Sequence, residues 1–178
     1  MMWETWRQIH RTGIISEKPP SAQESSPLGD TQSSDIQDEI LKVLGRALTI
    51  RLVDAGSCNG CELELNALGN AYYNLEGLGI KFVASPRHAD MLMLTGPISR
   101  NMLAAMLITH DAMPDPKLVV AVGDCAVNGG IFGESYATIG AAMNEIKVDF
   151  NIPGCPPEPL VILQGILSAV RYRFERRS

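Results

Sequence analysis

The pattern of hydrophobic and polar residues changes at about residue 35. Residues 16–34 are rich in Ser, Pro, Gln and acidic residues, which makes them too polar to build a core. Before them, Trp3, Trp6 and Ile9 recur at a helix-like spacing. We therefore predict that residues 1–35 are an N-terminal tail, either disordered or docked on a partner or on the domain itself. Residues 36–178 are then the globular domain.

From residue 36 the chain alternates helical patterns with short apolar runs. An amphipathic helix comes first, capped by Ser34 or Asp35, with apolar residues at intervals of three and four: Ile36, Ile40, Leu41, Val43 and Leu44. The apolar runs are residues 48–53, 80–84, 91–94, 118–122 and 148–152, and further helical patterns are at 62–75, 100–110 and 160–174. Apolar strands separated by helices are typical of βαβ units. The predicted fold class is α/β, with a parallel sheet between two layers of helices.

Charge and hydropathy narrow the range of possible functions and locations. The chain has 15 Lys and Arg against 20 Asp and Glu, a net charge of -5, which disfavours nucleic-acid binding. No run approaches the ~20 apolar residues of a membrane-spanning helix, and residues 1–11 lack the apolar core of a signal peptide. We expect a chain in the cytoplasm, where thiols stay reduced and cysteines more often bind metals than form disulfides.

Four cysteines follow the carboxyl ends of predicted strands. Cys58 and Cys61 come after the first apolar run, Cys125 after the fourth and Cys155 after the fifth. Because parallel strands end at one edge, and open α/β sheets bind ligands there, we expect the four thiols to converge. An all-cysteine site suits an iron–sulfur cluster.

The loops around the cysteines support a bulky anionic ligand. Glycines let backbone N–H groups approach it, and they stand at Gly56, Gly60, Gly123 and Gly154. Pro156 and Pro157 are predicted to form the first turn of the helix after Cys155. Structural zinc and four unrelated buried cysteines remain alternatives. Zinc sites usually have two pairs of closely spaced ligands, however. Here only Cys58 and Cys61 form a close pair, and Cys125 and Cys155 are single cysteines far along the chain.

Four motifs together resemble a known family. They are Gly56-Ser57-Cys58-Asn59-Gly60-Cys61-Glu62-Leu63-Glu64, Ser85-Pro86-Arg87-His88-Ala89-Asp90, Gly123-Asp124-Cys125 and Pro153-Gly154-Cys155-Pro156-Pro157. As a set they resemble the small subunit of energy-converting, membrane-bound [NiFe] hydrogenases of the formate hydrogenlyase and hydrogenase-4 type. They also resemble the homologous cluster-bearing subunit of respiratory complex I. The likeness covers roughly residues 35–171.

The resemblance implies a flavodoxin-like sheet that carries one [4Fe–4S] cluster on Cys58, Cys61, Cys125 and Cys155. It also implies an oxidoreductase subunit that passes electrons between a ferredoxin-like iron–sulfur subunit and a large subunit with a nickel–iron active site. Antiporter-like membrane subunits would complete the complex, with this chain peripheral on the cytoplasmic side of the membrane. Since no cysteine follows Cys155, we expect one cluster only.

The spacing of the first two cysteines favours one branch of the family. The complex I relatives place them next to each other, whereas Asn59 and Gly60 separate Cys58 from Cys61 here, as in the hydrogenase branch. We therefore favour a hydrogenase subunit. The alternatives are the same relay in a complex I-type quinone reductase or a sulfur reductase and, from another class, a zinc-stabilised binding module.

The same resemblance also implies roles for charged residues within the motifs. Glu64 matches an acidic residue of the family, and this match implies a role in proton transfer. The alternative is a glutamate without a special role, exposed to solvent in the first turn of the following helix. Glu62 is expected to be solvated in the first helical turn, where the helix dipole favours it. Arg87 and His88 are expected beside the cluster, where they would compensate an added electron. Their alternative is a surface ion pair of Arg87 with Asp90.

Overall fold

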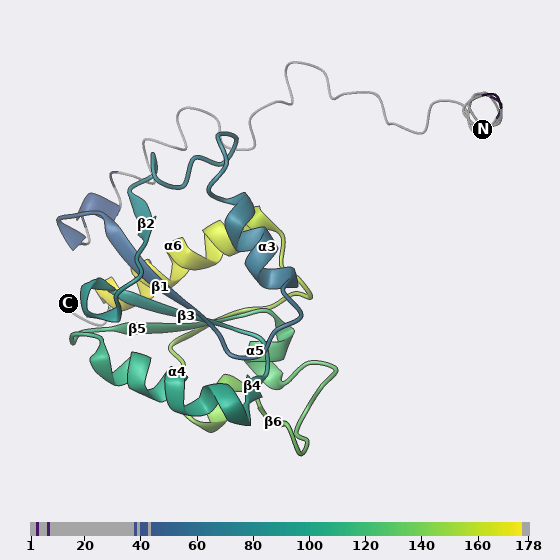
Figure 1. The fold of residues 1–178 in the computed structure, drawn as a ribbon. Helices are drawn as coiled ribbons and strands as arrows, with labels where there is room; N and C mark the ends of the chain where they lie inside the picture. The colour runs from purple at the N-terminus through teal and green to yellow at the C-terminus, as the bar shows by residue number, and fades with distance from the viewer. Residues whose placement is uncertain (1–2, 4–6, 8–37, 39, 43, 176–178) are drawn as a thin grey trace.

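The computed structural model describes residues 3, 7, 38, 40–42 and 44–175. Its centre is a five-stranded sheet in the order β2-β1-β3-β5-β7, in which all neighbours run parallel (Figure 1). The strands are β1 (Leu48–Asp54), β2 (Ile80–Phe82), β3 (Met91–Thr95), β5 (Leu118–Val122) and β7 (Phe150–Ile152). This is the flavodoxin-like strand order. The predicted α/β fold class is confirmed, and each of the five apolar runs coincides with a strand to within two residues at each end.

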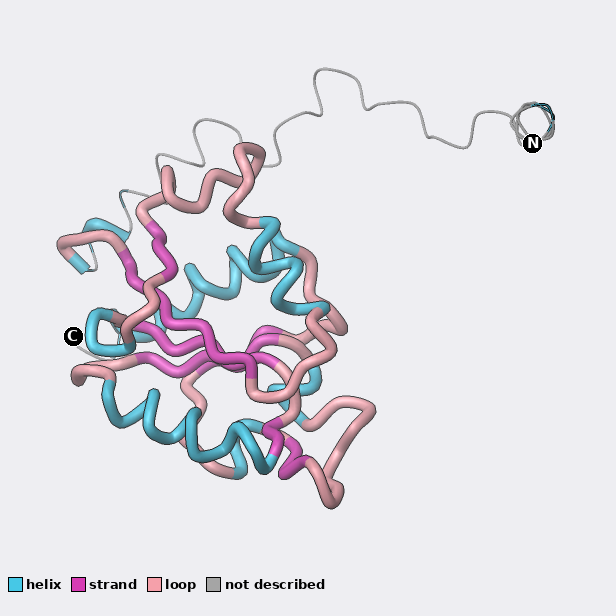
Figure 2. Tube along the Cα trace, viewed as in Figure 1, coloured by secondary structure: helices cyan, strands magenta, loops and turns pink. Residues whose placement is uncertain are grey.

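Helices and two short ribbon strands complete the described fold (Figure 2). The helices are α3 (Gly60–Ala67), α4 (Arg100–Ala112), α5 (Asp124–Asn128) and α6 (Pro159–Glu175), with 3₁₀ turns η1 (Pro86–His88) and η2 (Ala142–Asn144). An antiparallel ribbon joins β4 (Ile98–Ser99) to β6 (Thr138–Gly140). The short helix α5 and the ribbon were not predicted, because elements of two to five residues carry too few positions to show a period.

The helices cover both faces of the sheet, α3 and α6 on one side and α4 and α5 on the other (Figure 1). Alternate residues of β3 divide between the two cores. Met91 and Met93 pack in the core that contains α6, whereas Leu92 and Leu94 pack in the core that contains Met106 of α4. Successive strand residues point to opposite faces, and both faces are buried here. This is why the strands read as unbroken apolar runs.

Helix α3 ends at Ala67, earlier than the predicted 62–75. Gly69 and Asn70 follow after the C-cap residue Leu68, and the side-chain carbonyl of Asn70 accepts hydrogen bonds from the backbone N–H groups of Tyr72 (2.8 Å) and Tyr73 (3.0 Å). A side chain that bonds its own backbone in this way competes with the helix. The apolar periodicity continues past residue 67, but the chain forms turns.

The prediction that Pro156 and Pro157 open the last helix is wrong, because α6 begins at Pro159. Gly154 has a φ of +138°, and a Cβ there would lie 2.6 Å from Pro157 Cα. The chain therefore turns sharply after Cys155 before the helix starts. Pro159 takes the first helical position, where a missing N–H leaves no helical hydrogen bond unmade.

Residues 38–44 are helical where the structure describes them, and Ile40 is buried in the core, as the predicted amphipathic helix requires. The predicted tail, residues 1–35, lies outside the described residues except for Trp3 and Arg7, and its boundary stays a prediction. Within the described ranges, no helix is long and apolar enough to cross a membrane.

Candidate metal centre

The four cysteines lie beyond the carboxyl ends of three parallel strands. Cys58 follows β1 and Cys61 is the second residue of α3, while Cys125 is in α5 after β5 and Cys155 follows β7. Cys61 and Cys125 are buried, and Cys58 and Cys155 are exposed. The pair after β1 lies at the point where the strand order reverses between β1 and β3. In flavodoxin-like sheets that point forms the ligand crevice.

The cysteines are close enough to affect one another's ionisation. The pKa of Cys61 is raised to about 12, first by burial and then by the negative charges of Glu62 and the other three cysteines. The pKa of Cys125 is also raised, first by burial and then mainly by Cys155 and Cys58. Four thiolates at one edge therefore need a compensating positive charge. A bound metal supplies that charge and deprotonates its thiol ligands.

A turn fixed by Asp54 shapes the loop before the first two cysteines. Its Oδ1 accepts hydrogen bonds from the backbone N–H groups of Gly56 (2.8 Å) and Ser57 (2.7 Å). The Ser57 hydroxyl oxygen in turn accepts from the N–H of Asn59 at 3.0 Å. Sequence reasoning did not assign Asp54 a role, although an Asp two residues before a Gly-Ser pair is a signal for such a turn.

Asp124 joins the other two cysteine loops. Its Oδ1 accepts a hydrogen bond from the N–H of Gly154 (2.8 Å), and its own N–H donates to the Gly154 carbonyl oxygen (2.8 Å). The loops of Cys125 and Cys155 are therefore held together by two hydrogen bonds across 30 residues of sequence. The sequence identifies Asp124 only as part of a motif, because its hydrogen-bond partner, Gly154, is known only from the fold.

Two glycines leave room for the thiols. A Cβ on Gly123, whose φ is +85°, would lie 2.5 Å from Cys61 Sγ, and a Cβ on Gly130 would lie 2.7 Å from Cys125 Sγ. Both distances are too short for a real side chain, so only glycine fits. The backbone is thus shaped around the two buried sulfur atoms, as a close-fitting cluster site requires.

The two acidic residues of α3 occupy different environments. Glu64 is partly exposed, three residues after Cys61, and its predicted proton-transfer role stays a prediction. Glu62 is only 7% exposed, and neither of its buried carboxylate oxygens has a hydrogen-bond partner. The expectation of a solvated Glu62 is therefore wrong, because α3 turns this position inward together with Cys61 and Leu65.

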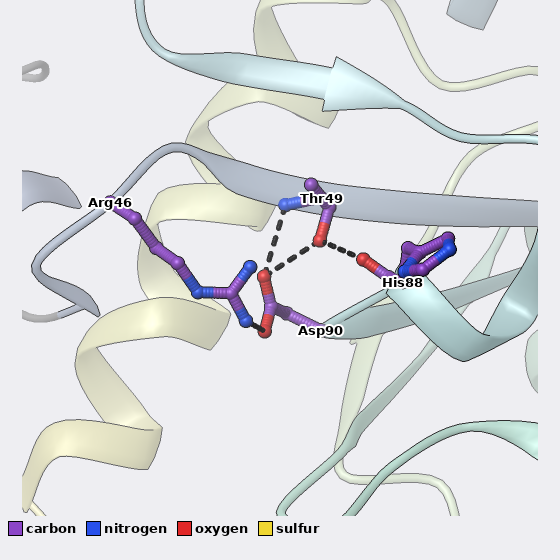
Figure 3. A network of polar contacts seen from close by, with 4 residues as sticks. All are labelled: Arg46, Thr49, His88 and Asp90. Atoms are coloured by element: carbon purple, nitrogen blue, oxygen red, sulfur yellow. Dashed lines mark hydrogen bonds and ion pairs between the residues drawn. The ribbon is translucent and has the colours of Figure 1, made fainter.

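The turn η1, with Arg87 and His88, is anchored near the amino-terminal ends of β1 and β3 (Figure 3). The Thr49 hydroxyl lies 2.6 Å from the carbonyl oxygen of His88 and 2.8 Å from Asp90 Oδ2. Thr49 is the second residue of β1, and the cysteines follow the opposite end of that strand. Phe82, the last residue of β2, and Met91, the first residue of β3, both pair with Ile50, so the connection that contains η1 starts and ends near this end of β1. The predicted role of Arg87 and His88 beside a cluster stays a prediction.

Asp90 pairs with a different cation from the one expected. Arg46 Nη2 lies 2.6 Å from Asp90 Oδ1, and the backbone N–H of Thr49 donates to Oδ2 at 3.2 Å. The alternative of an Arg87–Asp90 pair is therefore wrong. Asp90 is 9% exposed, and its contacts tie the start of β3 to the segment that enters β1.

The cysteine arrangement bears on the choice between zinc and a cluster. Among the residues that the structure describes, no three His, Cys, Asp or Glu side chains gather as they would around a single metal ion. Structural zinc needs its sulfur ligands about 2.3 Å from one point. Each cysteine of a [4Fe–4S] cluster binds a different iron, so the sulfurs surround a larger volume. The two kinds of centre therefore differ in how far apart they hold their cysteine sulfurs.

Comparison with known proteins identifies the family. Residues 58–169, which include all four cysteines, match the family described as "NADH ubiquinone oxidoreductase, 20 Kd subunit". The chain belongs to this family. The resemblance drawn from the four motifs is thereby confirmed, together with the assignment to a subunit of oxidoreductase complexes.

Individual relatives come from several kinds of complex. The chain is 41% identical over 132 residues to "Probable membrane-bound hydrogenase subunit mbhJ" of Pyrococcus furiosus, with 74% of this chain and 79% of the relative covered. It is 39% identical over 141 residues to "Formate hydrogenlyase subunit 7" of Escherichia coli, which covers 79% of this chain and 55% of the relative. The chain thus spans only about half of the second relative.

Among solved structures, a chain of the "membrane-bound sulfane sulfur reductase (MBS), an archaeal respiratory membrane complex" superposes with a TM-score of 0.62 at 29% identity. The superposition covers 80% of this chain and 87% of that chain. Members of this family therefore occur in multisubunit, membrane-bound oxidoreductases of different chemistry.

Proposed function

We propose that this chain is the electron-transfer subunit of a membrane-bound [NiFe] hydrogenase complex. Its cofactor is one [4Fe–4S] cluster, a one-electron carrier, held by Cys58, Cys61, Cys125 and Cys155. The observation that carries the proposal is the gathering of four mutually interacting cysteines at the carboxyl edge of a flavodoxin-like sheet.

The chain's own residues make this edge a cluster site. Cys61 and Cys125 are each only 9% exposed, so the surrounding protein largely excludes water from them. Cys58 and Cys155 lie at the surface. Hydrogen bonds to Asp54 fix the first cysteine loop, and such supporting contacts orient ligands and tune a site.

Glu64 is the residue that we assign to proton transfer. It follows Cys61 by three residues on α3 and is partly exposed, so it can exchange protons with groups outside the chain while it stays near the cysteines. A carboxylate at this position would be close enough to a cluster on the cysteines to take up or release a proton there.

The proposed partners are those that the resemblance implies, and the multisubunit complexes of the relatives support partners of this general kind. They are a large subunit with the nickel–iron site, a ferredoxin-like iron–sulfur subunit and antiporter-like membrane subunits, with this chain peripheral on the cytoplasmic side. The names of the Pyrococcus and Escherichia relatives support the hydrogenase assignment, as does the separation of Cys58 and Cys61 by two residues. The second candidate is the same relay in a sulfur- or quinone-reducing complex. The likeness to the sulfane sulfur reductase chain favours that alternative.

The experiment is metal and spectroscopic analysis of the anaerobically purified complex. We expect about four irons and as many labile sulfides from this subunit, as one cubane requires. A paramagnetic signal after dithionite reduction and nickel in the same sample are also expected. The cluster without nickel would move the chain to the sulfur- or quinone-reducing relatives. Zinc without iron would overturn any redox role.

A single substitution tests the ligand set. Cys155 is exposed, so Cys155→Ser is expected to leave the fold intact and to lower the iron content and the reduced-state signal. Thermal unfolding of the same sample separates loss of a ligand from loss of the fold. Unchanged iron and an unchanged signal would remove Cys155 from the ligand set.

A further inference from the structure

Three of the four glycines that the sequence predicts to offer N–H groups to a ligand donate them inside the chain instead. Gly56 donates to Asp54 Oδ1, Gly123 to the carbonyl oxygen of Ile152 and Gly154 to Asp124 Oδ1, each at 2.8 Å. For these three glycines the expectation of donors that face an anion is therefore wrong. Hydrogen bonds to the sulfur atoms of a cluster help it to accept an electron. With these donors engaged elsewhere, the site favours a lower reduction potential.

Asp124 engages one of these donors and lies next to a cysteine. It is the first residue of α5, directly before Cys125, and its carboxylate bridges to the loop of Cys155 through Gly154. Asp124 is partly buried, so water and salt screen its charge less than that of an exposed carboxylate.

The charge of Asp124 reaches the Cys125 sulfur. Burial is the largest cause that raises the pKa of Cys125, the charges of Cys155 and Cys58 come next, and Asp124 adds to the increase. A carboxylate that disfavours a negative sulfur also disfavours a further electron on the cluster that this sulfur would bind, because reduction adds one negative charge. The charge of Asp124 and its hydrogen bond with Gly154 therefore act on the potential with the same sign.

We propose that Asp124 is a positioning residue that lowers the reduction potential of the cluster. It occupies the Gly154 N–H and holds a negative charge beside Cys125. The inference rests on the proposed relay function and adds a direction to it. A carrier of lower potential gives up its electron more readily, which favours delivery of electrons to a catalytic subunit that reduces protons.

The test is Asp124→Asn in the full complex, because an asparagine can still accept the Gly154 N–H through Oδ1 but carries no charge. The reduction potential is measured by anaerobic redox titration followed by electron paramagnetic resonance. The signal of this cluster is the one that Cys155→Ser removes. We expect the ratio of reduced to oxidised cluster at a fixed potential to rise about tenfold in Asp124→Asn, a shift of about 59 mV for one electron.

Glu158→Gln is the matched control for the loss of one negative charge. Glu158 lies three residues after Cys155 and is exposed, so its charge is screened by water and salt. The control should leave the ratio of reduced to oxidised cluster close to the wild-type value.

Asp124→Ala separates the charge from the hydrogen bond. It removes both, so the two cysteine loops lose one of the two hydrogen bonds that join them. We expect the potential to rise at least as far as in Asp124→Asn. Iron retention against a chelator should also fall about 10–100-fold, whereas Asp124→Asn should retain iron as the wild type does.

The outcomes separate this inference from the relay function. An unchanged potential in Asp124→Asn, or an equal shift in Glu158→Gln, would overturn the inference and leave the relay function standing. Iron loss in Asp124→Asn equal to that in Asp124→Ala would also overturn it, because Asp124 would then be needed for the fold of the loops alone. A wild-type complex without an iron–sulfur signal would overturn the relay function together with the inference.

Discussion

Replacing Gly123 with alanine tests whether the backbone is shaped around a sulfur ligand. The new Cβ would lie 2.5 Å from Cys61 Sγ. Non-bonded heavy atoms are at their best separation at about 3.5–4.0 Å, so the sulfur would have to move away by about 1 Å. Metal–ligand distances tolerate only about 0.2 Å. We expect Gly123→Ala to lose most of its bound iron.

A second glycine separates this clash from backbone strain. Gly79 has a φ of +80°, close to the +85° of Gly123, but a Cβ there would meet nothing within 4 Å. An alanine at a positive φ costs about 1–3 kcal/mol, and each kcal/mol lowers the Tm of a chain of this size by about 2–4 °C. Both variants should show this loss of stability. Only Gly123→Ala should lose iron.

The assay is iron and acid-labile sulfide per chain after anaerobic purification, with electron paramagnetic resonance of the reduced protein and a thermal unfolding scan. If Gly123→Ala retained wild-type iron and signal, Cys61 would not be a ligand held against this backbone. Equal iron loss in the Gly79→Ala control would also refute the reasoning, because strain alone would then explain the effect.

Three further predictions concern stability and metal retention. Asp90→Ala removes the acceptor of an ion pair and a backbone hydrogen bond. It should cost about 1–3 kcal/mol in denaturant unfolding without changing iron content, and iron loss would show that the network also supports the cluster. The cluster-free chain should lose stability as pH rises from 9 toward 12. The pKa of Cys61 is about 12 when folded and near 9 when unfolded, so the unfolded chain releases its proton first; a flat stability profile over this range would contradict the burial of this thiol. Asp54→Ala frees two N–H groups of the first cysteine loop and should weaken iron retention against a chelator about 10–100-fold, whereas retention at the wild-type rate would exclude a supporting role.

Much of the fold could be predicted because strand and helix patterns are local. The run 118–122 is β5 residue for residue, and the patterns at 100–110 and 160–174 match α4 and α6 within two residues at each end. The pattern at 62–75 misled because Asn70 competes for backbone N–H groups, an effect that apolar spacing does not report.

The candidate site was predictable to the extent that it depends on strand direction. Parallel strands place the residues after their carboxyl ends on one edge, so the order of strands and cysteines along the chain was enough to predict the edge on which all four cysteines lie. Sequence gave no signal for the burial of Glu62, which depends on how α3 is rotated against the sheet. It also gave none for the partner of Asp124, which lies 30 residues away in the chain.

The sequence by itself therefore determined the class of sheet, the edge that carries the cysteines and the family. These depend on periodicity and on residue types at short spacing. Only the tertiary structure decided which charges are buried, where η1 is anchored, and that residues 129–137 between α5 and β6 are held by Arg100 and start beside Cys125. These properties depend on contacts between residues far apart in the chain, and such contacts form only when the layers pack.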